Sequence, residues 1–104
     1  GNMAVKEKAA RIDGRKTTKY DVKVGDDVFE CEIQEPTFDQ ISAALSQTKK
    51  NGNIDMIACG KVIWELCCVS FSEELEKNSK ILISLCIDLA NDYAMPISVE
   101  LKKK

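Results

Sequence analysis

The sequence contains no histidine and, among its 104 residues, only two prolines. Without imidazole the chain has neither a Ser–His nor a Cys–His nucleophile pair, and no histidine ligand for a metal ion. The glycine motifs that cradle phosphates, GxGxxG and GxxxxGK[ST], are also missing. These absences exclude the commonest hydrolytic and nucleotide-binding designs. We therefore expect a protein that is not an enzyme and needs no cofactor or metal.

Cysteine is present, but in a pattern that suits neither zinc nor a disulfide framework. The five cysteines are an odd number, and no two of them form a CxxC pair. Each occupies an apolar position of a predicted strand or helix, where a reduced thiol acts as a small hydrophobic group. The adjacent Cys67 and Cys68 would point about 100° apart on a helix, which disfavours a bridge between them. We predict five reduced, structural cysteines.

The sequence also lacks a net positive charge and long hydrophobic runs. The formal net charge is −2, whereas nucleic-acid binding needs several cations to displace phosphate counterions. The longest apolar run is far shorter than the roughly 20 residues of a membrane span, and the amino end lacks a signal-like pattern. Lys102, Lys103 and Lys104 are interpreted as a solvated basic end. These features predict a cytoplasmic protein that binds neither nucleic acid nor membrane.

The length and the 44% hydrophobic content predict one domain. Residues 1–16 open with GNM, interpreted as the remnant of an expression tag, and continue as a charged stretch with few apolar positions. A short helix over residues 5–12 is an option, but nothing anchors it. The prediction is a flexible tail at residues 1–16, followed by a single α+β domain at residues 17–104.

Residues 17–34 carry the clearest local signal, because apolar and polar residues alternate on both sides of Gly25-Asp26. This pattern predicts a β-hairpin. A two-residue loop places Val22 opposite Phe29 and keeps the apolar residues on one face. A four-residue loop does the same, whereas a three-residue loop exchanges the faces. The predicted apolar face comprises Tyr20, Val22, Phe29, Cys31 and Ile33.

Helices are predicted after the hairpin. Pro36 ends the second strand, and Thr37 with Gln40 forms a capping box that begins a helix. Its apolar stripe is Phe38, Ile41 and Leu45, and its closing residues are Lys49, Lys50 and Gly52.

The stretch over residues 54–70 is too apolar for a surface helix, so it is predicted to be a central helix that begins at Asn53 and is buried around Trp64. Gly60 within it costs roughly 1 kcal/mol relative to alanine. Close approach of a neighbouring element would explain this glycine. Glu73, Glu74 and Glu76 then suggest a short helix.

The last predicted helix spans residues 80–93, with Ser79 as its cap. Its polar line is narrow, which leaves Ile83 and Ile87 beside the main apolar stripe. Residues 97–101 alternate between apolar and polar types and are either a third strand of the sheet or an extended tail. We prefer the strand. The resulting fold is a hairpin, with this third strand, packed on three to four helices.

The two long helices have more apolar surface than one small sheet can cover. We therefore expect a protein-interaction surface on the last helix, with Ile83 and Ile87 as candidate partner-binding residues. An amphipathic helix of another protein is the expected partner. The alternative is a structural subunit that uses the same surface to form an oligomer.

The run VFECEIQEPTFDQISAAL joins a strand to a proline-started amphipathic helix. In this layout the chain resembles small tail assembly chaperones encoded by tailed phages and prophages. Members of that group are short acidic proteins with further helices and a basic carboxyl end, a layout that residues 17–104 follow. The resemblance implies binding to a tape-measure protein during tail assembly, without catalysis. It assigns no site residue.

Overall fold

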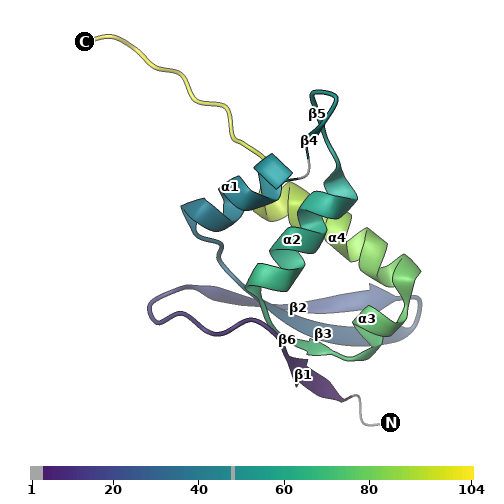
Figure 1. Ribbon diagram of the computed structural model, residues 1–104. Helices are drawn as coiled ribbons and strands as arrows, with labels where there is room; N and C mark the ends of the chain where they lie inside the picture. Colours follow the sequence, from purple (N-terminus) through teal and green to yellow (C-terminus); the bar gives the residue numbers. More distant parts are fainter. Residues whose placement is uncertain (1–3, 48) are drawn as a thin grey trace.

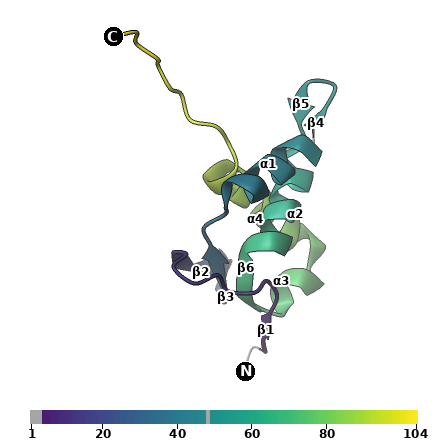
Figure 2. The same cartoon turned by 60° about the vertical axis from the view of Figure 1, so that its left-hand side comes forward.

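The computed structural model describes residues 4–47 and 49–104, and the fold is of the α+β class (Figure 1). The described residues contain a four-stranded antiparallel sheet, a separate two-stranded ribbon and four helices. The strands are β1 (Val5–Glu7), β2 (Thr17–Val24), β3 (Asp27–Gln34), β4 (Lys49–Lys50), β5 (Asn53–Ile54) and β6 (Cys68–Ser72). The helices are α1 (Phe38–Gln47), α2 (Met56–Cys67), α3 (Glu74–Lys77) and α4 (Ser79–Tyr93). The helices lie on one side of the sheet (Figures 1 and 2).

The predicted hairpin is confirmed, including its register. Val22 pairs with Phe29, and the two-residue turn lies between Val24 and Asp27. Gly25 adopts a left-handed φ of 60° at the first turn position, as a type II′ turn requires. The face that carries Cys31 and the other predicted apolar residues points towards the helices.

The third strand is not where the sequence pattern placed it. The central helix ends at Cys67 rather than at residue 70, and β6 follows at once between β1 and β3. Residues 97–101 form no strand, and the side chains of Ile97, Val99 and Leu101 are 77–94% exposed. The prediction failed because Cys68 and Val69 continue the apolar run of the central helix, and the serines after them suggested a helix cap instead of a strand.

The predicted amino-terminal tail is also corrected, since residues 5–7 form an edge strand rather than a helix or a free end. Val5 pairs with Ser72, and the chain then follows β6 to its start, where the amide of Ala9 donates to the carbonyl of Cys68 at 2.8 Å. The predicted tag remnant, residues 1–3, lies outside the described residues. The folded unit therefore begins before residue 17.

The capping box of α1 is confirmed. The amide of Thr37 donates to the side chain of Gln40 at 3.0 Å, and the amide of Gln40 donates to the hydroxyl of Thr37 at 3.1 Å. The predicted apolar stripe is partly wrong, because Phe38 is 85% exposed and the buried position of this helix is Ala44. Phe38 is the first residue of α1, and its side chain lies in solvent.

Between α1 and α2 the chain forms the small β4–β5 ribbon instead of a simple helix end. Asn51 and Gly52 both have left-handed φ angles, 52° and 81°, which define a type I′ turn. The predicted helix stop at Gly52 is therefore wrong, and so is the predicted cap at Asn53. Asp55 caps α2 by accepting a hydrogen bond from the amide of Ala58 at 3.0 Å.

Trp64 is fully buried at the centre of the core, as predicted. Its ring meets Phe71 of β6 edge to face at a centroid distance of 5.3 Å, and its Nε1–H donates to Glu76 of α3 at 2.7 Å. Gly60 lets α4 approach α2, because a Cβ there would lie 1.7 Å from the carbonyl oxygen of Cys86. The start of α4 is capped by Asn78 rather than by Ser79.

All five cysteines are buried, and none of them forms a disulfide bond. Burial raises the pKa of Cys31 and of Cys67 to about 11 and also raises the pKa of Cys68 and Cys86. These four thiols are therefore protonated at neutral pH, which makes them poor nucleophiles.

Candidate protein-interaction surfaces

The outer side of α4 carries the two residues that the sequence singled out. Ile83 is 43% exposed, whereas Ile87 is half-buried. Both lie within one turn of Cys86, where α4 packs closely on Gly60. On α2, Ile57 is similarly exposed. The helical layer thus leaves apolar side chains accessible, and Ile83 offers more free surface than Ile87 does.

The second surface is the outer edge of β2, which has a neighbour on one side only because the sheet order is β1-β6-β3-β2. The amide of Glu35 donates to the carbonyl of Lys16, so residue 16 directs its backbone groups towards β3. Because this direction alternates along a strand, the even-numbered residues of β2 also direct their backbone groups towards β3. In an antiparallel ladder the alternate residues then direct theirs outwards. These are Thr17, Lys19, Asp21 and Lys23.

Beside this edge, a groove of about 260 Å³ runs between β2 and α4. Tyr20 and Val22 line it from the strand, and Leu85 and Leu89 line it from the helix. Asp88 and Asp92 also line it from α4. A free strand edge beside an apolar groove with carboxylates is a typical place for an additional strand to bind.

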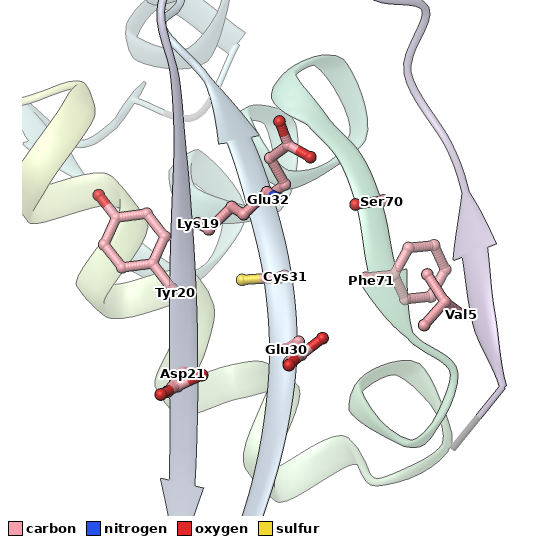
Figure 3. A pocket seen from close by; sticks show the side chains of 9 residues that line it. All are labelled: Val5, Lys19, Tyr20, Asp21, Glu30, Cys31, Glu32, Ser70 and Phe71. Carbon is pink, nitrogen blue, oxygen red and sulfur yellow. The ribbon is translucent and has the colours of Figure 1, made fainter. Parts of the chain in front are cut away.

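The sheet face turned away from the helices is polar and slightly hollow (Figure 3). The register places Lys19, Glu32 and Ser70 in one row, with Asp21 and Glu30 in the next. The hollow has a volume of about 380 Å³. The charged side chains that line the hollow are on β2 and β3. This face is therefore a solvated side of the sheet and not an apolar docking surface.

Glu32 on this face is buried and belongs to a structural ion pair. Both of its carboxylate oxygens accept hydrogen bonds from Arg11, at 2.8 and 2.9 Å. These bonds, together with a hydrogen bond from Thr17, lower the pKa of Glu32 to about 2. The pair fixes the amino-terminal loop across the end of the sheet.

We expect Glu32 to make the stability of the protein sensitive to acid. Because the folded-state pKa is lower than the ordinary value of 4.5, the contribution of Glu32 is full above pH 4.5 and is lost as the pH falls towards 2. Urea unfolding at a series of pH values measures this loss. Glu32→Gln should flatten the pH dependence in that window, whereas Glu30→Gln, at an exposed site of the same strand, should keep it. Equal slopes for Glu32→Gln and the wild type would contradict the assignment.

A second ion cluster joins the amino-terminal segment to the helices. The ammonium of Lys8 lies 2.9 Å from Glu65 and 2.8 Å from Glu76, which also accepts from Trp64. Burial opposes the ionised form of Glu76, but the hydrogen bonds from Lys8 and Trp64 outweigh it, so the pKa of Glu76 is lowered. The two carboxylates therefore form ion pairs and hydrogen bonds within the fold, and neither is available as a catalytic acid or base.

Among residues 4–47 and 49–104 there is no group of three or more side chains placed to hold a metal ion. In the same part of the chain, no helix is both long and apolar enough to cross a bilayer. No family model matches the sequence, and no curated protein or solved structure matches it. The protein is therefore described by its own structure. It has an α+β fold, with accessible apolar side chains and a strand edge that has no neighbour in the sheet.

Sequence reasoning located Ile83 and Ile87 but missed the β2 edge. The two isoleucines followed from helical periodicity, which is local. Whether a strand lies at an edge depends instead on the order of the strands in the sheet. That order could not be derived from a sequence in which residues 68–72 were not predicted to be a strand. The signal available was the pair Lys19 and Lys23, since lysine is common on edge strands.

Proposed function

We propose that this chain is a non-catalytic protein-interaction module that binds a helix of another protein on the outer side of α4. The observation that carries the proposal is the exposure of Ile83, 43%, at the rim of the contact between α2 and α4. An isoleucine at such a site loses its water-exposed area when a partner helix covers it, which favours binding.

The more specific form of this proposal is a phage tail assembly chaperone whose partner is a tape-measure protein. It is supported by the strand, proline and helix layout of residues 28–45 and by the basic residues 102–104. The resemblance implies binding to a tape-measure protein during tail assembly, and an accessible apolar helix surface suits such a contact.

A second candidate function, a self-associating structural subunit, is favoured by a different observation. The eight residues of β2 form an edge strand with one side free. Free edges pair readily with another chain. The two candidates place the contact on different surfaces, so substitutions distinguish them.

Ile83→Lys is expected to abolish co-purification with a phage tape-measure protein when the two are produced together. Ile87→Lys should weaken it less, because Ile87 is already half-buried in its own fold. Far-ultraviolet circular dichroism should stay unchanged for Ile83→Lys, since its side chain is largely in solvent.

The matched control is Val28→Lys, since Val28 is 41% exposed but lies on β3, away from α4. It should retain the partner. Equal retention of the partner by Ile83→Lys and by the control would contradict an interface on α4. Failure of the wild type to bind would contradict the chaperone proposal.

A further inference from the structure

The last residues of the chain have the pattern of a β-strand but no partner within their own fold. Ile97, Val99 and Leu101 alternate with polar residues and are 77–94% exposed. The segment leaves the end of α4 and projects away from the rest of the molecule (Figures 1 and 2). An extended segment with one apolar side is suited to pairing with a free strand edge.

We propose that residues 97–101 of one copy add an antiparallel strand to the outer edge of β2 in a second copy. In the register that sets Val99 opposite Tyr20, the apolar side chains of the added strand face the groove between β2 and α4. Ile97 then lies beside Val22, and Leu101 beside Thr18. The polar side chains fall on the open face of the sheet.

Charge selects this register. With Val99 opposite Tyr20, Glu100 lies opposite Lys19, an attractive cross-strand pair. A shift by two residues that brings Val99 opposite Val22 instead sets Glu100 opposite Asp21. Like charges in directly opposed positions are destabilising.

The direction of the added strand is also selected by charge. A parallel strand with Val99 at Tyr20 places Glu100 at Asp21 and Lys102 at Lys23, both unfavourable. In the antiparallel arrangement the last lysines pass the start of β2. This register also sets Lys103 opposite Lys16 and Lys104 opposite Arg15, outside the proposed strand, and the carboxylates of Glu35 and Asp92 beside Lys16 offset these cations.

The antiparallel direction points to a second copy rather than to the chain's own edge. In Figure 1, α4 runs against the direction of β2, and the hydroxyl of Tyr93 at its end bonds the hydroxyl of Tyr20. A chain that continues from Tyr93 in this direction soon passes the start of β2 at Thr17. Residues 97–101 therefore overshoot their own β2, whereas a second copy can supply them from the Val24 end. Mutual exchange gives a closed, two-fold dimer.

The wild-type chain is therefore expected to show, in size-exclusion chromatography with light scattering, twice its chain mass of 11.6 kDa. Val99→Asp should return it to the monomer mass and keep the helical circular dichroism signal, because Val99 is exposed in the separate chain. Ile83→Lys should remain dimeric. A monomeric wild type, or a dimer lost in Ile83→Lys and kept in Val99→Asp, would overturn the proposal. Neither result bears on the helix partner, so the proposed function is tested separately.

A charge exchange tests the register itself. Glu100→Lys and Lys19→Glu should each weaken the dimer by roughly tenfold, since each replaces two attractive pairs by like-charge pairs. An equimolar mixture of the two variants should regain the wild-type dissociation constant, because the mixed dimer has one pair as in the wild type and one exchanged pair, and both are opposite in sign. A mixture no tighter than either variant alone would exclude this register.

Discussion

Gly60→Ala is expected to destabilise the protein strongly, although alanine favours an isolated helix by about 1 kcal/mol. A Cβ at this position would lie 1.7 Å from the carbonyl oxygen and 2.7 Å from the Cα of Cys86. These are backbone atoms of α4, so no side chain can rotate away. The two helices must separate, and overpacking of this kind costs about 3 kcal/mol at the upper end of its usual range.

Urea unfolding followed by circular dichroism measures the effect of Gly60→Ala. Ser42→Ala, at an exposed position of α1, is the control for helix propensity alone and should change the unfolding free energy little. A Gly60→Ala protein as stable as the wild type would show that α2 and α4 do not pack as closely as described.

Trp64→Ala is expected to cost about 3–5 kcal/mol, the usual range for removal of a large buried aromatic side chain. The substitution removes the edge-to-face contact with Phe71. It also removes the indole donor to Glu76, which then keeps only Lys8 as a partner among the bonds described.

Trp64→Phe separates the two contributions, because it keeps a ring beside Phe71 and removes the donor. We expect it to lose less stability than Trp64→Ala and to raise the pKa of Glu76 towards its ordinary value. Unfolding is followed by circular dichroism, because the chain has only one tryptophan. An unchanged midpoint for Trp64→Ala would place Trp64 outside the core.

The parts of the fold that follow from short-range rules were predictable. The hairpin register followed from alternation around Gly25-Asp26, and the start of α1 followed from Thr37 and Gln40. Both depend on residues within a few positions of each other. Burial of Trp64 also followed, because the helix around it is apolar on more than one side.

The parts that failed depend on partners far away in the sequence. Residues 68–70 were taken for the end of the central helix because Cys68 and Val69 continue its apolar run, and Ser72 was taken for part of a helix cap. Val5–Glu7 has no apolar stripe of its own and becomes a strand only because β6 offers an edge. For the candidate site, periodicity gave Ile83 and Ile87, whereas the β2 edge required the strand order.

The position of β6 has a consequence for synthesis of the chain. The β2–β3 hairpin is complete by residue 34, but its neighbour in the sheet is made of residues 68–72, and α4 ends at residue 93. Contacts between distant segments form slowly because a long loop must first close. During translation the hairpin therefore emerges with its apolar face uncovered, a stage at which unpaired edges promote aggregation. The charged side chains on its other face, among them Lys19, Asp21 and Glu30, are expected to oppose this aggregation.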